Sequence, residues 1–291
     1  MQHATPLAMA TFVVELAPAI VFAFAGERVA QACARWPSSV RIASPVLCAL
    51  PYVAISSSQH MFSWGWCVLY AVLPVGIAWL LVQAATSDPE QRGNWRDFTV
   101  LLALGVPVDL RWFEPAWPHG LEGLGKLLLV DAALYGFVTI RQLSGTGFDF
   151  HLRWSDWKTG LRELAYFAPL VIGLGLVLGF LHPHGNPPRL SMIGTWIYIF
   201  VFVAVPEELF FRAWLQNLLE RRLGRQAALA ITAVLFGLSH FNKRSAHFNW
   251  RYVLLASVAG IFYGRAWREQ RRVPASTITH ASVDAIWTFW F

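Results

Sequence analysis

Ionisable side chains interrupt apolar sequence in the last third of the chain, where a buried charge is costly without a partner. Glu207 and Glu208 are adjacent, and Arg212 follows Glu208 by four residues. In a helix, Glu208 and Arg212 therefore share a face, whereas Glu207 points about 100° away from Glu208. In a soluble helix this spacing is typical of an exposed salt bridge. The apolar residues on both sides favour a buried, chemically active group here.

Two histidines lie in similar surroundings further along the chain. His240 follows the apolar run 227–238, and His280 precedes Asp284 by four residues, again on one helix face. A histidine at a helix end can simply cap carbonyl groups, and a His–Asp pair can be structural. The same groups can also serve in catalysis, with the carboxylate orienting the imidazole.

Together, these side chains could support hydrolysis in two ways. A glutamate in a low-dielectric setting, beside a second glutamate, can act as a general base near neutral pH and activate water. Two histidines and two glutamates could instead hold Zn²⁺. The sequence lacks the HExxH pattern of many zinc proteases, and its two candidate histidines belong to separate predicted helices. We therefore expect a glutamate base and no cofactor, with zinc as the alternative.

The composition predicts the elements that must position these residues. Of 291 residues, 56% are hydrophobic and only 14% are charged, against about 25% charged in soluble proteins. Apolar runs near the length of about 20 residues needed to cross a bilayer recur along the chain, and the 15 Trp fit interfacial anchoring. We predict an all-α, polytopic integral membrane protein of about 8–10 transmembrane helices.

The polar stretch 141–163 separates an N-terminal set of apolar segments from a C-terminal set. We therefore divide the chain into N-terminal transmembrane helices at 1–160 and a catalytic part at 161–291. The net charge of +6 resides mainly in short loops, where it would set topology rather than bind nucleic acid.

Simple alternation of the crossings creates a conflict, because it places His240 and His280 at different depths. The conflict disappears if the helix at 227–241 is short and tilted, if a loop dips inward, or if the topology differs in this half.

The three blocks, in this order on separate helices, resemble the CPBP family of intramembrane proteases. These are also called CAAX proteases and bacteriocin-processing enzymes, and the Ras-converting endopeptidase is one of them. The family pattern is EExxxR, FxxxH and then HxxxN or HxxxD, and this chain has Glu207-Glu208 to Arg212, Phe236 to His240, and His280 to Asp284. The resemblance covers about residues 192–291, and nothing in 1–160 carries it.

The resemblance implies cleavage of a peptide bond by an activated water molecule. Glu207 and His240 would activate the water, His280 and residue 284 would stabilise the oxyanion, and Glu208 with Arg212 would support Glu207. Position 284 is often Asn, and an ionised Asp cannot donate a hydrogen bond. Asp284 must therefore be protonated or, as we prefer, orient His280.

The expected partners are a membrane-anchored protein or peptide substrate and the lipid bilayer, with no nucleic acid. The excess of Arg over Lys hints at a GC-rich bacterial genome, so we expect a bacterial cytoplasmic membrane. Two other functions stay open: an ion- or proton-coupled transporter, although no repeated halves are visible, and a silent family member that acts as a binding or immunity protein. No residue selects among prenylated CAAX ends, leader peptides and sorting tails as substrates.

Overall fold

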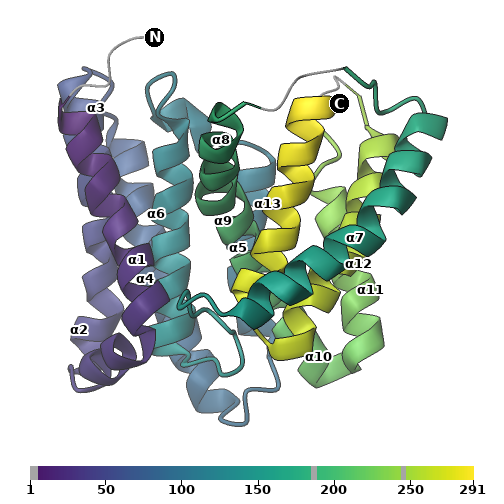
Figure 1. Ribbon diagram of the computed structural model, residues 1–291. Coiled ribbons are helices and arrows are strands. Elements are labelled where there is room, and N and C mark those ends of the chain that lie inside the picture. Colours follow the sequence, from purple (N-terminus) through teal and green to yellow (C-terminus); the bar gives the residue numbers. More distant parts are fainter. Residues whose placement is uncertain (1–5, 185–188, 244–246) are drawn as a thin grey trace. The chain divides into compact units, whose positions relative to one another are not determined.

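The computed structural model describes residues 6–184, 189–243 and 247–291, and all regular secondary structure in these ranges is helical (Figure 1). The helices form two compact units, residues 1–144 and 145–291. This confirms the predicted all-α class. The expected division between residues 160 and 161 lies inside a helix, α7 (Trp154–Val177), whereas the two units meet between residues 144 and 145.

Six helical stretches in the described ranges are long and apolar enough to cross a membrane. They are α1 (Pro6–Ala34), α2 to α3 (Ser38–Ser58), α4 (Trp64–Ser87), α6 with its continuation (Glu122–Ile140), α7, and α8 to α10 (Ser191–Leu223). The chain is thus a polytopic membrane protein. Two further helices, α12 (Trp250–Gln270) and α13 (Val273–Trp290), have 21 and 18 residues and are less apolar.

Unit 1 contains α1 to α6. Its α5 (Trp95–Asp109) begins with a capping box, in which Asn94 accepts backbone hydrogen bonds and Asp97 accepts one from the Asn94 amide. The short apolar segment 98–108, which contains Gly105 and Pro107, thus lies within one continuous helix. A buried Arg141 pairs with Asp97 and Asp88 at 2.9 and 2.6 Å.

Unit 2 contains α7 to α13, and its core is built by α7, α11 (Arg225–Leu238), α12 and α13. Small residues let these helices approach closely, as is usual in membranes. At Gly160 of α7, an added Cβ would lie 2.8 Å from the Ala275 carbonyl oxygen of α13. At Gly237 of α11, it would lie 2.4 Å from the Val253 carbonyl oxygen of α12. These contacts fix α13 against α7 and the end of α11 against α12.

A buried ion cluster holds the start of α13. Arg272, the residue before the helix, donates hydrogen bonds to Asp156 at 2.7 Å and Asp149 at 2.8 Å. Burial alone would raise the pKa of Asp149, but hydrogen bonds from Arg272 and His151 outweigh it and hold that pKa well below its usual value. The hydrogen bond to Asp156 raises the pKa of Arg272, against the opposing effect of burial. The position of α13 is therefore set before its first turn.

Gly147 completes this anchor through its backbone. Its φ of 71° lies in the left-handed region, and an added Cβ would meet the carbonyl oxygen of Arg271 at 1.9 Å. Its own carbonyl oxygen accepts a hydrogen bond from the Val273 amide at 2.9 Å. Only glycine permits this approach without a backbone shift.

The helix that carries Glu207 and Glu208 is irregular. The short α9 (Val205–Glu208) lies between two stretches with wider, π-type turns, Phe200–Ala204 and Leu209–Gln216. Pro206 in α9 cannot donate a backbone hydrogen bond, and π-type turns inside α-helices are frequent at functional sites.

Candidate active site

His280 lies at the end of a fully buried chain of polar contacts. Its Nδ1 lies 2.9 Å from Oε1 of Glu208, and Oε2 of Glu208 accepts a hydrogen bond from Nε of Arg212 at 3.0 Å. The side chains of Glu208 and Arg212 are completely buried, and that of His280 is 2% exposed. Because an ionised carboxylate only accepts hydrogen bonds, Nδ1 of His280 carries the proton. The contacts from Arg212 through Glu208 to His280 therefore fix both the orientation and the tautomer of this imidazole.

Aromatic rings surround the guanidinium of Arg212. Its central carbon lies 5.2 Å from the ring centre of Phe236 and 5.9 Å from those of Phe211 and Tyr263. Among the described residues, its two terminal nitrogens have no hydrogen-bond partner. Cation–π attraction and the Glu208 carboxylate thus stabilise the buried charge.

The other ring nitrogen of His280 faces two further carboxylates. Nε2 lies 3.8 Å from Oε2 of Glu207 and 3.6 Å from Oδ2 of Asp284, both longer than a hydrogen bond. Glu207 also lies 3.8 Å from Nζ of Lys243, and its side chain is 26% exposed. The two adjacent glutamates therefore differ: Glu208 is sealed in the core, whereas Glu207 can meet water.

His240 lies in the turn after α11, and its Nδ1 is 2.8 Å from the carbonyl oxygen of Phe236. A carbonyl oxygen can only accept, so Nδ1–H donates and the lone pair lies on Nε2. The hydroxyl of Ser239 donates to the same carbonyl at 2.8 Å. The ring of Tyr252 packs against His240 with centroids 4.7 Å apart. His240 is thus held as a hydrogen-bond acceptor.

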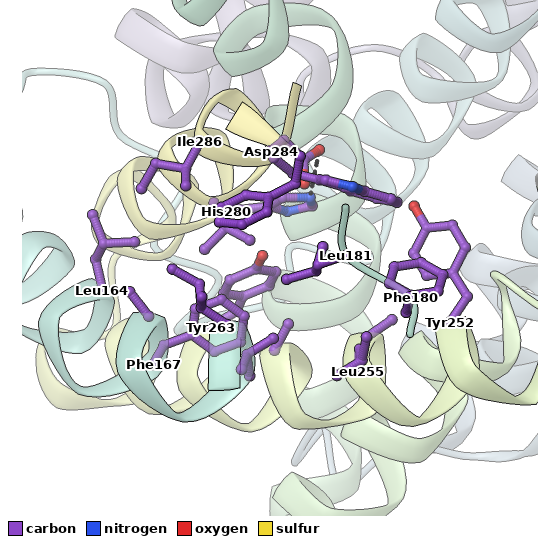
Figure 2. A pocket seen from close by; sticks show the side chains of 18 of the residues that line it. Leu164, Phe167, Phe180, Leu181, Tyr252, Leu255, Tyr263, His280, Asp284 and Ile286 are labelled. Carbon is purple, nitrogen blue, oxygen red and sulfur yellow. Dashed lines mark ion pairs between the residues drawn. The ribbon is translucent and has the colours of Figure 1, made fainter. Parts of the chain in front are cut away.

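Both histidines line one cavity of about 80 Å³, together with Asp284 (Figure 2). The ring of Phe236 contacts both imidazoles, at 5.0 Å from His240 and 5.6 Å from His280. The lining is otherwise mostly aliphatic and aromatic, with side chains from α7, α12 and α13. The cavity could hold a few water molecules or part of an apolar side chain.

The length of α11 removes the conflict over depth. Its 14 residues span about 21 Å, less than a hydrocarbon core of about 30 Å. A short helix was one part of the first explanation that we considered, and α11 has that length. His240 can therefore reach the same cavity as His280.

The contact expected to orient His280 comes from a different residue. Glu208, which the sequence pattern placed beside Glu207 as support, makes the hydrogen bond to Nδ1 at 2.9 Å. Asp284 is at 3.6 Å from the opposite nitrogen. The carboxylate of Glu208 reaches His280 because α13 packs against α9, a contact that the spacing within either helix cannot reveal.

The sequence pattern missed Tyr263 of α12. Its ring lies flat on His280, with centroids 4.5 Å apart and an angle of 15° between the planes. A tyrosine in an apolar helix carries no signal of such a role, because helical periodicity alone does not tell which neighbour it faces.

Metal ligands were the chemical alternative to a glutamate base. In the ranges 6–184, 189–243 and 247–291, no group of three or more His, Cys, Asp or Glu side chains is arranged to hold a metal ion.

The geometry thus joins Glu207, Glu208, Arg212, His280 and Asp284 by direct contacts and brings His240 to the same cavity. Residues 189–286 match the model of the family described as type II CAAX prenyl endopeptidase Rce1-like. By this match the segment resembles a CAAX protease domain, and we refer to it by that name. All six residues lie inside it, and it occupies about one third of the chain.

No curated protein and no solved structure matches the chain. The CAAX protease domain lies entirely within unit 2 and runs from just before α8 into α13. The chain is therefore an integral membrane protein, and about one third of it is similar to a protease domain of the CAAX type. Helix α7 lies outside the matched segment, although it packs against α12 and α13 and lines the cavity.

Proposed function

We propose that this protein cleaves a peptide bond of a membrane-associated precursor, with Glu207 as the general base. The observation that carries the proposal is the contrast between the two glutamates. Glu208 is fully buried and bonded to Arg212 and His280, whereas Glu207 is 26% exposed and lies next to Nε2 of His280. One carboxylate is sealed in the core, and the other is accessible to water beside His280.

The reaction requires only water and the substrate. Glu207 takes a proton from the attacking water, while the Nε2 lone pair of His240 accepts the second hydrogen and fixes the direction of attack. The oxygen of the water bonds to the carbonyl carbon and produces an oxyanion. Glu207 then passes its proton to the leaving nitrogen as the C–N bond breaks. The products are a carboxylic acid and an amine, which then exchange the remaining proton and become a carboxylate and an ammonium ion.

His280 acts on the oxyanion in this scheme. Because its Nδ1–H is bonded to Glu208, a second proton on Nε2 gives a donor that faces the side of Glu207 and Asp284. A donor held in place before the reaction stabilises developing negative charge strongly in a water-poor site. The buried chain of Arg212 and Glu208 thus serves to hold His280 rather than to support Glu207 alone.

The cavity favours a substrate with an apolar part near the cleaved bond. It is lined mostly by aliphatic and aromatic groups, and the domain is embedded among apolar helices. A membrane-anchored protein or peptide meets this requirement. We place the protein in a bacterial cytoplasmic membrane, as its composition hints.

The test starts in cells and ends with purified protein. Membrane and secreted proteomes of wild-type and Glu207→Gln strains are compared for a precursor that accumulates in the variant, and its cleavage is then measured in vesicles. We expect Glu207→Gln to lose at least about 10²-fold in activity and to fold normally. Glu90→Gln, at an exposed carboxylate outside the domain, is the matched control and should cleave normally.

Processing at the wild-type rate by purified Glu207→Gln protein would refute the glutamate mechanism. Stoichiometric zinc in the purified protein, with activity lost on chelation and restored by zinc, would instead establish the metal alternative. Inactivity of the wild-type protein on every candidate precursor would favour a silent binding or immunity protein.

A further inference from the structure

Tyr263 places a hydroxyl group beside the imidazole of His280. The side chain is 1% exposed and lines the cavity together with His280 and Asp284. Figure 2 shows the phenol oxygen turned from α12 toward His280. The two rings are stacked nearly parallel, with centroids 4.5 Å apart and 15° between their planes, so the phenol lies directly against the imidazole.

This hydroxyl has no hydrogen-bond partner among the residues that the structure describes. The buried tyrosines of unit 1 behave differently. The hydroxyl of Tyr70 accepts a hydrogen bond from Trp117 at 2.7 Å, and that of Tyr52 accepts one from the Ser63 amide at 3.0 Å. Buried polar groups are nearly always bonded. A buried phenol that faces a cavity without a protein partner is therefore available to a ligand in that cavity.

The proposed reaction needs such a donor. An oxyanion can accept more than one hydrogen bond, and His280 supplies one of them through Nε2. The residue at 284 cannot supply another while it is an ionised Asp, because a carboxylate only accepts. A neutral phenol can donate its O–H, and Tyr263 lines the same cavity as His280.

We propose that Tyr263 is a catalytic residue whose hydroxyl donates a hydrogen bond to the oxyanion, next to the one from His280. This inference rests on the proposed function. It assigns to α12 a role that the three sequence blocks do not contain. No proton is transferred by Tyr263, so the balance of the reaction is unchanged: the phenol O–H stays intact and stabilises charge only while the tetrahedral intermediate exists.

The first test is Tyr263→Phe, which keeps the ring on His280 and removes only the hydroxyl. The probe is the precursor identified in the Glu207→Gln strain or, in parallel, an internally quenched peptide ending in a prenylated CAAX sequence. We expect kcat to fall by about 10²-fold with little change in KM. Tyr166→Phe is the matched control, because this tyrosine of α7 is 56% exposed, and it should retain the wild-type kcat.

The second test is rescue by Asp284→Asn. The amide of Asn can donate to the same oxyanion, so the loss caused by Tyr263→Phe should be at least tenfold smaller in the Asp284→Asn background. A purely positional role of the Tyr263 ring predicts the same loss in both backgrounds. Equal losses would therefore overturn the proposal even if Tyr263→Phe is impaired.

A third measurement does not depend on turnover. A peptide aldehyde with the sequence on the acyl side of the cleaved bond forms a hydrate that resembles the tetrahedral intermediate. Its affinity should fall in Tyr263→Phe by about the same factor as kcat, while the affinity of the carboxylate product stays within about twofold. Equal losses for both ligands would indicate damage to the pocket and would overturn the proposal.

The outcomes separate this inference from the function on which it rests. An inactive Glu207→Gln with a fully active Tyr263→Phe would refute only the role of Tyr263. A fully active Glu207→Gln would refute the proposed mechanism itself. If Tyr263→Phe fails to fold, Tyr263→Leu takes its place, measured with and without Asp284→Asn, and equal losses in the two backgrounds would overturn the proposal.

Discussion

Two buried arginines of this protein, one in each unit, form ion pairs of two kinds. One pair is purely structural, and the other also holds a histidine of the candidate active site. Arg141 of unit 1 uses all of its nitrogens: Nε bonds to Asp97, and the terminal nitrogens bond to Asp97 and to side-chain and backbone oxygens of Asp88. Among the residues that the structure describes, Arg212 of unit 2 bonds to Glu208 alone, and aromatic rings surround the rest of its guanidinium.

The two ion pairs differ in the partners of the two carboxylate oxygens. Both carboxylate oxygens of Asp97 accept hydrogen bonds from Arg141, so the cluster is complete in itself. Glu208 gives one oxygen to Arg212 and the other to His280, so the buried charge acts on a second ionisable group. A buried ion pair is thus purely structural when the carboxylate gives both of its oxygens to the arginine. It can contribute to catalysis when the carboxylate also bonds to an imidazole.

The largest expected effect contrasts the two arginines directly. Arg141→Met and Arg212→Met should each destabilise the fold by about 3–5 kcal/mol, because each leaves a buried carboxylate without its cation. Only Arg212→Met should also lose cleavage activity per folded molecule, because only this change frees Glu208, the carboxylate that holds His280. Thermal unfolding in detergent and activity of the size-selected folded fraction check both statements. An equal loss of specific activity in the two variants would show that the contrast is wrong.

A smaller effect separates the two carboxylates near His280. Glu208→Gln should lower kcat by about 10²-fold or more, because the charged acceptor that fixes the His280 tautomer is gone. Asp284→Asn should leave kcat near the wild-type value or raise it, since the amide adds a donor. Steady-state kinetics of both variants decide the order. A greater loss in Asp284→Asn would restore Asp284 as the residue that orients His280.

The smallest effect concerns the ion cluster of Arg272, Asp156 and Asp149 at the start of α13. The folded state lowers the pKa of Asp149 below its usual value of 3.8, so this carboxylate contributes stability above that pH and loses it as the pH falls through the folded value. Asp149→Asn should therefore be less stable than the wild type at neutral pH, and the two should converge in acid. Unfolding temperatures measured from pH 7 downward test this, and a constant difference would contradict the assignment.

Much of the site could be predicted from the sequence because its residues occur in short spacings on single helices. The i,i+4 relation predicted the Glu208–Arg212 pair, which the structure contains. The hydrogen bond from His280 to Glu208 joins residues 72 positions apart, and the stacking of Tyr263 depends on how α12 is rotated. Such contacts follow from helix packing, which a periodic pattern does not determine.

The same limit applies to the fold. The hydrophobic composition was enough to predict an all-helical membrane protein, whereas the expected eight to ten crossings compare with six long apolar helices in the described ranges. The apolar run 227–238 was already short in the sequence, and α11 (Arg225–Leu238) follows it closely. What the sequence could not show is that Gly237 packs against α12.

The shortness of α11 ties this protein to its lipids. A helix of about 21 Å is in hydrophobic mismatch with a core of about 30 Å, and the surrounding bilayer relieves the mismatch by thinning locally. Each added pair of methylene groups in the acyl chains makes that thinning more costly. We therefore expect the turn that holds His240, and with it the cavity, to respond to the thickness of the bilayer.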